Sequence, residues 1–338
     1  MMQADDPAAR FADLAARFAS RRILVVGDLM LDEFIWGKVS RISPEAPVPI
    51  VNVTGESYYP GGAANVARNL REFTAGVALM GMAGTDAAGA RLLELLAAAG
   101  IDTAGVQREA DYQTITKTRI IARNQQVVRV DRERKPAMTG AQTALAIEQL
   151  DRAVPGVDAI VVADYGKGFL TQPLADHLCR IALAHGKVLT VDPHPYTSLS
   201  WRGVTAIKPN RAEAFLVAGL PPAEPVTPVL SDLALLEAGK RLRQLWQPEN
   251  LLITLGEHGM LLLAGDAPAS HTPTRAKDIF DVSGAGDTAI AVLTLGLAAG
   301  ATPAEAAELA NRASGIAVGK LGTATVTAAE LAASFGSL

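Results

Sequence analysis

The feature that most constrains this chain is a regular alternation between short, almost wholly apolar runs and longer segments with helical spacing. Nearly continuous apolar runs are typical of strands buried on both faces, as in parallel sheets covered by helices. We therefore predict an α/β fold with a mostly parallel sheet and helices on both faces. The predicted strands span residues 23–28, 77–84, 157–166, 187–193, 203–210, 250–256 and 260–265, and the helices residues 87–99, 173–184 and 232–246.

Two stretches, residues 47–53 and 115–133, alternate apolar and polar side chains instead. Such alternation indicates strands buried on one face only. Residues 113–123 and 125–131 are predicted to pair as a hairpin, so we expect a small separate sheet that serves as a lid or a dimer interface. The prediction is one domain, residues 1–338, with lid segments at about 34–59 and 112–133.

Composition excludes several classes of protein. The net charge is −4 and aromatic residues are 5% of the chain, which disfavours nucleic-acid binding. A single cysteine excludes an internal disulfide and a cysteine-rich zinc site. The apolar run at residues 289–301 is shorter than the ~20 residues of a membrane span, and it predicts a buried core helix. With no secretory signal at the N-terminus, we expect a soluble, cytoplasmic protein that takes no membrane or nucleic-acid partner.

The most informative motif is DVSGAGDT, residues 281–288, directly before that apolar helix. Small residues at a helix start let backbone N–H groups approach an anion, and the helix dipole favours negative charge there. Asp287 is either a helix cap or a base beside a bound phosphate, and the local residues leave both open. The match to a dinucleotide fingerprint is rejected because the motif lies far from the first βαβ unit. Walker A and protein-kinase motifs are absent.

Two polar clusters follow predicted strand or loop ends in the first part of the chain. In PGGAANVARNL, Asn65 and Asn69 share one helix face after a glycine pair, and they either grip sugar hydroxyls or form a solvated face. In GDLMLDEF, Asp32 is a candidate ligand for sugar hydroxyls. We interpret Asp28 as a helix cap.

Two further segments have both structural and functional interpretations. Asn210 and Glu213 lie three apart at a helix start, which fits a capping box or a hydrated Mg²⁺ site. The glycines of TLGEHG, residues 254–259, permit either a close approach to a nucleotide or a tight hairpin turn.

The order of these motifs, GGAANVA, then N-x-x-E, then D-x-x-G-A-G-D, resembles the ribokinase-like (PfkB) family of sugar kinases from residue 23 to about 322. Within it, GKVSRISPEAPVPIV (37–51) and DYGKG (164–168) are similar to the D-glycero-D-manno-heptose-7-phosphate kinases of the ADP-heptose pathway, which supplies the lipopolysaccharide inner core. The resemblance implies transfer of the γ-phosphoryl of ATP, with Mg²⁺, to the C1 hydroxyl, giving heptose 1,7-bisphosphate. A kinase for another sugar or nucleoside and a non-catalytic sensor remain alternatives.

The resemblance also implies roles for individual residues. Asp287 is the general base, and the amides of Gly284, Ala285 and Gly286 form an anion hole. Asn210 and Glu213 organise Mg²⁺ and the ATP phosphates, largely through water. The remaining expected ATP-site residues are Lys208, Thr254, Gly256, Gly259 and Asn311, and the expected sugar-site residues are Asp32, Gly61, Gly62 and Asn65.

A sugar phosphate also needs a cationic pocket for its own phosphate. The candidates, chosen by location, are Arg68, Lys117, Arg123 and Lys167. NRAE stands where the family has N-L-S-E, and VDPHP stands where V-D-P-K-G is common in the two-domain enzymes, so a basic nucleotide contact is either missing or supplied by Lys208. No H-x-G-H motif occurs, which predicts a stand-alone kinase, and the lid predicts a homodimer.

Overall fold

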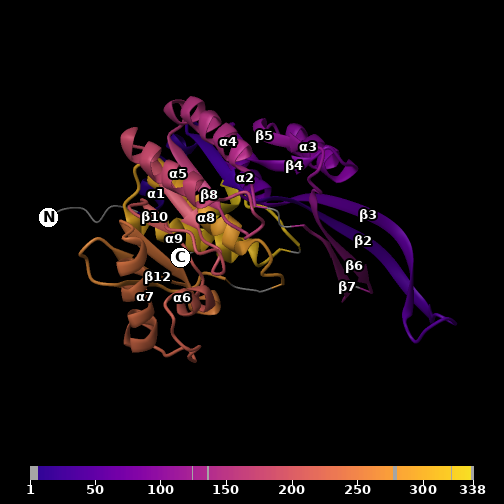
Figure 1. Ribbon diagram of the computed structural model, residues 1–338. Helices are drawn as coiled ribbons and strands as arrows, with labels where there is room; N and C mark the ends of the chain where they lie inside the picture. The colour runs from indigo at the N-terminus through magenta and orange to yellow at the C-terminus, as the bar shows by residue number, and fades with distance from the viewer. Residues whose placement is uncertain (1–6, 124, 135–136, 277–279, 321, 336–338) are drawn as a thin grey trace.

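The computed structural model describes residues 7–123, 125–134, 137–276, 280–320 and 322–335. Its larger sheet has the strand order β13-β12-β11-β10-β9-β8-β1-β4-β5 (Figure 1). All neighbours in it pair in parallel except β11–β12 and β12–β13. The strands are β1 (Arg22–Gly27), β4 (Gly76–Gly84), β5 (Asp102–Glu109), β8 (Ala159–Ala163), β9 (Val188–Asp192), β10 (Ala206–Ile207), β11 (Asn250–Thr254), β12 (Met260–Ala264) and β13 (Ser270–Thr272).

Helices cover both faces of this sheet, as the apolar strands predict. Alternate residues of β1 enter separate cores: Ile23 and Val25 pack on one side, Leu24 and Val26 on the other. The first core contains residues of α1 (Pro7–Phe18), α2 (Ala63–Arg71), α3 (Ala87–Ala98), α8 (Ala285–Ala298), α9 (Pro303–Ala317) and α10 (Ala328–Ala333). The second contains residues of α4 (Gly140–Ala153), α5 (Gln172–Ala184), α6 (Arg211–Val217) and α7 (Leu233–Trp246).

The predicted α/β class is therefore confirmed, and so is the buried helix at residues 289–301, most of which lies in α8. None of the helices in the described part of the chain is long and apolar enough to span a membrane. The predicted strand at 203–210 shortens to Ala206–Ile207, and β5 was not predicted.

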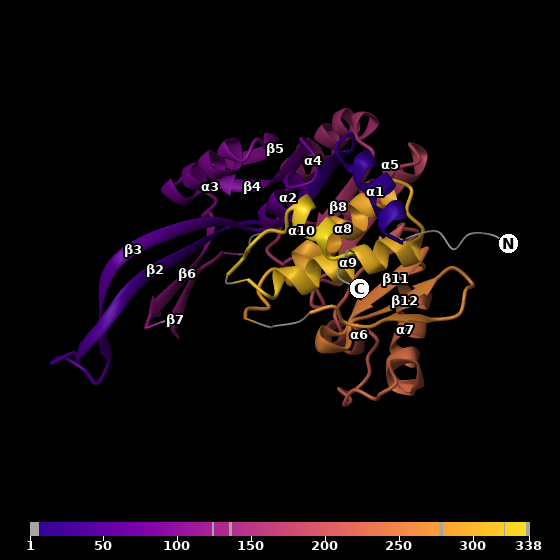
Figure 2. The same ribbon diagram turned by 180° about the vertical axis from the view of Figure 1, so that it is seen from behind.

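A second, smaller sheet has the order β3-β2-β6-β7 and projects to one side of the molecule (Figure 2). Its strands are β2 (Leu29–Ile42), β3 (Pro49–Gly62), β6 (Ile115–Ala122) and β7 (Gln125–Arg132). The predicted β6–β7 hairpin is confirmed, although residue 124 of its turn lies outside the described residues. We call this four-stranded sheet the lid sheet.

The first half of β2 escaped prediction because Leu29, Met30 and Leu31 are all buried where the strand leaves the large sheet, so no alternation is visible. Since a strand follows β1 directly, the interpretation of Asp28 as a helix cap is wrong. Asp28 is buried, and its carboxylate accepts three backbone hydrogen bonds from the loop after β8.

Candidate active site

Asp287 lies in the first turn of α8, which begins after Gly284 in the left-handed conformation at φ 79°. Its carboxylate does not cap the helix. Oδ2 accepts a hydrogen bond from Asn65 Nδ2 on α2 at 2.7 Å, and Oδ1 accepts one from the Tyr165 hydroxyl in the loop after β8. Two elements distant in sequence therefore hold this side chain, and the cap interpretation is excluded.

Burial raises the pKa of Asp287 to about 6, although the hydrogen bonds from Asn65 and Tyr165 act in the opposite direction. The carboxylate is thus mostly ionised at neutral pH but takes up a proton more readily than an ordinary aspartate. A general base works best with a pKa near the working pH, so the electrostatics suit proton abstraction.

The start of α8 offers backbone donors beside this carboxylate. The first amides of a helix have no intrahelical acceptor, which favours an anion there. The Ala285 amide donates to the Val282 carbonyl at 3.3 Å, so the Gly286 amide is better placed to serve an external anion. A Cβ at Gly286 would lie 3.6 Å from Lys208 Nζ, which places this predicted cation at the helix start. Lys208 is buried and pairs with Asp192 at 3.0 Å.

Asn210 and Glu213 form the capping box that their spacing predicts. Asn210 Oδ1 accepts from the Glu213 amide at 2.9 Å, and Glu213 Oε2 accepts from the Asn210 amide at 2.7 Å. Burial raises the pKa of Glu213. Among the described residues, no three His, Cys, Asp or Glu side chains gather as a metal cage. This donor set fits a Mg²⁺ ion that keeps most of its water ligands.

A cavity of about 170 Å³ opens beside the start of α8. Gly259, at φ 84°, makes the tight turn between β11 and β12. A Cβ at this position would collide with the Thr272 carbonyl, so the turn requires glycine. The turn interpretation of TLGEHG is confirmed, and the same glycines line the cavity, while their close approach to a nucleotide stays a prediction. Most of the wall consists of glycine, alanine, serine and threonine, which fits a flat ligand such as a nucleobase. The predicted ATP-site residues that line the cavity are Thr254, Gly256, Gly259 and Asn311.

The predicted sugar-site residues meet where β2 and β3 join α2. Asp32 is buried on β2, and a Cβ at Gly61 would collide with its carboxylate. Gly62, at φ 60°, precedes the first turn of α2, which carries Asn65. Asn65 Oδ1 is buried without a hydrogen-bond partner in the described part of the chain, so one acceptor stays available beside Asp287.

Three of the four predicted cations lie near this region. Arg68 stacks on the Tyr59 ring at 5.7 Å and lines a cavity of about 660 Å³ between the lid sheet and residues 281–283 and 322–324. Lys117 lies 3.9 Å from Asp131, and Lys167 pairs with Glu133.

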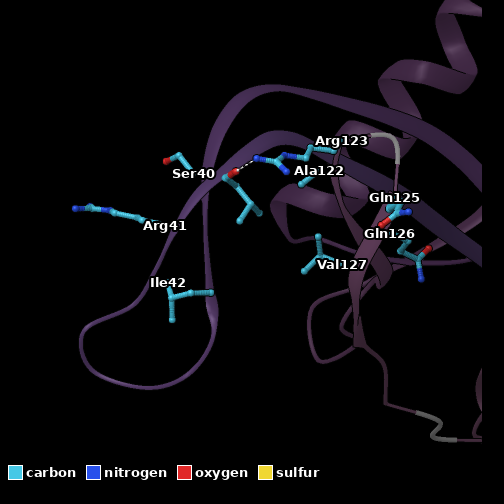
Figure 3. A pocket seen from close by; sticks show the side chains of 9 residues that line it. Ser40, Arg41, Ile42, Ala122, Arg123, Gln125, Gln126 and Val127 are labelled. Carbon is cyan, nitrogen blue, oxygen red and sulfur yellow. Dashed lines mark hydrogen bonds between the residues drawn. The ribbon is translucent and has the colours of Figure 1, made fainter.

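Arg123 does not belong to this group. It lies six residues beyond Lys117 at the far end of the hairpin, about 20 Å along a strand. Its side chain donates to the Val39 carbonyl at 3.1 Å and lines a groove with Arg41 and Ile42 (Figure 3). The prediction placed it by its position in the lid sequence, which does not say how far a residue lies from the site.

Nearly the whole chain is similar to one known protein family. Residues 20–330 match the model of the pfkB family carbohydrate kinases. The chain belongs to this family. It is 43% identical over 317 residues to the bifunctional protein HldE of Desulfatibacillum aliphaticivorans, covering 94% of this chain and 63% of the relative. For HldE of Trichlorobacter lovleyi the identity is 42% over 320 residues, covering 95% and 64%. The chain thus spans just under two thirds of the length of these relatives.

Solved structures share the fold of this chain. Phosphofructokinase-2 from Escherichia coli in complex with potassium superposes with a TM-score of 0.73 at 19% identity, covering 94% of this chain and 98% of that one. Ribokinase from Thermotoga maritima gives 0.71 at 19% identity, covering 94% and 99%. These neighbours confirm the ribokinase-like fold. Family membership makes this chain an ATP-dependent sugar kinase.

Three residues of the site were missed by the sequence analysis. Tyr165 lies in DYGKG but was not singled out, because nothing local shows that its hydroxyl reaches α8. Arg119 pairs with Asp32 at 2.5 Å. It shares a strand face with Lys117, so the period of two in β6 could have found it. Asp192 contacts Lys208, and only its position at the end of β9 hinted at a role.

Proposed function

We propose that this kinase transfers the γ-phosphoryl group of ATP to the C1 hydroxyl of D-glycero-D-manno-heptose 7-phosphate, giving heptose 1,7-bisphosphate. Asp287 takes the proton of the attacking hydroxyl, and the α8 amides with Lys208 stabilise the charge of the transferring group. The observation that carries the proposal is the buried Asp287 carboxylate, with a pKa of about 6, at a helix start beside a buried lysine. Phosphoryl transfer depends mainly on positioning and charge neutralisation, and this arrangement supplies both.

The nucleotide belongs in the cavity beside α8, with its phosphates toward Gly286 and Lys208. Asn210 and Glu213 are the residues that would hold hydrated Mg²⁺. When bound, Mg²⁺ neutralises charge on the phosphates and fixes their orientation. The chain itself contributes the capping box, which holds the Glu213 carboxylate in place at the start of α6.

Two likenesses of the sequence support the choice of sugar. RISPEAPVPIV and DYGKG resemble the heptose-7-phosphate kinases, and the relatives at 42–43% identity are named bifunctional protein HldE. We propose that this chain carries out the kinase step of such proteins in the cytoplasm.

The 7-phosphate belongs in the 660 Å³ cavity, where Arg68 and Arg119 lie together. Burial lowers the pKa of Arg68, while the charges of Glu72 and Asp32 act in the opposite direction. A half-buried guanidinium that lines this cavity is suited to bind a phosphate. Lys117 and Lys167 stay as candidates, whereas Arg123 is withdrawn.

The test is ADP release from ATP and Mg²⁺ with heptose 7-phosphate, fructose 6-phosphate, ribose or adenosine. The proposal predicts turnover with heptose 7-phosphate at a kcat/KM at least tenfold above the others. Turnover of another acceptor would discard the sugar and keep the Asp287 chemistry. Silence with all four, while ATP still binds, would contradict the proposal and favour a sensor.

A further inference from the structure

The base proposed above has two fixed hydrogen-bond donors, one on each oxygen. Asn65 Nδ2 donates to Oδ2, and the Tyr165 hydroxyl donates to Oδ1. A carboxylate offers about four lone-pair sites, so two donors fix its plane and still leave room for a substrate hydroxyl. The second of these donors, the Tyr165 hydroxyl, has no role in the function proposed above.

Tyr165 reaches Asp287 because a second buried carboxylate fixes its backbone. Asp28, at the end of β1, accepts from the amides of Tyr165 and Lys167 at 3.0 Å and of Phe169 at 3.1 Å. The side chain of Asp28 is 2% exposed. Three backbone amides that donate to one buried carboxylate hold residues 165–169 against the carboxyl end of the large sheet.

Asp164 fixes the same loop from its other side. Its Oδ1 accepts from the Gly166 amide at 2.8 Å, and its Oδ2 accepts from the Thr197 hydroxyl. Gly166, at φ 63°, makes a turn that other residues rarely adopt, and a Cβ there would press on the His194 ring. The loop is therefore built to present Tyr165 in one orientation.

We propose that Tyr165 is a positioning residue for Asp287. The Tyr165 hydroxyl orients the Asp287 carboxylate and favours the ionised form of that carboxylate. The inference rests on the proposed role of Asp287 as the base. A hydrogen bond to the charged form of an acid lowers the pKa of that acid, so the donor offsets part of the cost of burial. Burial and the nearby Asp287 charge raise the pKa of Tyr165 well above its ordinary value, which keeps the phenol a proton donor.

The first test needs no substrate. Titration of the Asp287 carboxyl carbon by NMR, assigned by comparison with Asp287→Asn, follows its ionisation in wild type and Tyr165→Phe. Loss of a hydrogen bond to a charged group is expected to move the Asp287 midpoint up by about one pH unit. Tyr58→Phe is the matched control, since it removes a hydroxyl that donates to Glu56 at 2.6 Å on the lid sheet, and it should not move the midpoint.

The second test is the pH dependence of kcat/KM. In Tyr165→Phe, the acidic limb of the kcat/KM profile should move to higher pH by about one unit. The variant should then lose about tenfold in kcat/KM below pH 6 and little at pH 8. Asp28→Asn, which weakens the support of the loop and keeps the phenol, should shift the limb in the same direction. An unchanged midpoint, or a loss equal at every pH, would overturn the inference.

The two proposals fail in different ways. If the NMR midpoint moves but Asp287→Asn keeps full turnover, the hydroxyl controls the ionisation of Asp287 and the proposed base is wrong. If Asp287→Asn abolishes turnover and Tyr165→Phe moves neither the midpoint nor the pH limb, the base stands and the role of Tyr165 is wrong.

Discussion

The chemistry of this site depends on where individual side chains are buried. Asp287 and Asp28 are both aspartates at the carboxyl edge of the same sheet, and burial raises the pKa of each. Asp28 accepts three backbone amides and has a structural task, whereas Asp287 accepts two side-chain donors beside a helix start. The different partners, and not the residue type, separate a scaffold carboxylate from a candidate base.

Residues of the site could be predicted from sequence where one segment contains the whole motif. The Asn210–Glu213 capping box and the glycines at the start of α8 follow from local spacing and are found as expected. Tyr165 and Arg119 could not be assigned in this way, since their partners lie 122 and 87 residues away in the chain. Such contacts depend on the register of strands and the packing of helices.

At the scale of elements, β2 connects the two sheets and carries neighbouring carboxylates on opposite faces of the lid sheet. Asp32 pairs with Arg119 on the face toward the proposed sugar site. Glu33 contacts Thr118 and lies 4.0 Å from Arg132 on the other face. Because successive side chains of a strand point to opposite faces, Asp32 is a proposed substrate ligand, whereas Glu33 makes a contact within the lid sheet.

This pair gives a matched test. Asp32→Asn should raise the KM for the sugar at least tenfold, because a neutral amide loses the charge-assisted bonds to sugar hydroxyls and its ion pair with Arg119. Glu33→Gln should change that KM less than twofold. Steady-state kinetics at saturating ATP measures both, and equal effects would show that Asp32 acts only through the lid fold.

At the scale of the whole molecule, the large sheet could be predicted from apolar runs that alternate with helical segments. The separate lid sheet could be predicted from the alternation of apolar and polar side chains. What the patterns could not give was the length of the lid strands or which of its residues face the site. The lid sheet has two edge strands, β3 and β7, and every residue of β7 is exposed. Unpaired edges tend to associate.

We propose that a second copy of this chain covers the lid sheet. Val128 and Val130 lie on one face of β7 and are 45% and 40% exposed. The double variant Val128→Asp/Val130→Asp should convert a dimer to a monomer at micromolar concentration, as measured by light scattering, with the large sheet still folded. A wild-type monomer under the same conditions would contradict the proposal.

The most direct measurement compares kcat and the ATP dissociation constant of wild type and Asp287→Asn. A general base contributes about 10²–10⁴-fold in rate, so kcat should fall by that factor while ATP affinity changes less than threefold. The free energy of unfolding at pH 8 should not fall, because a buried amide costs less than a buried charge. A variant that keeps near-normal kcat would show that Asp287 is not the base.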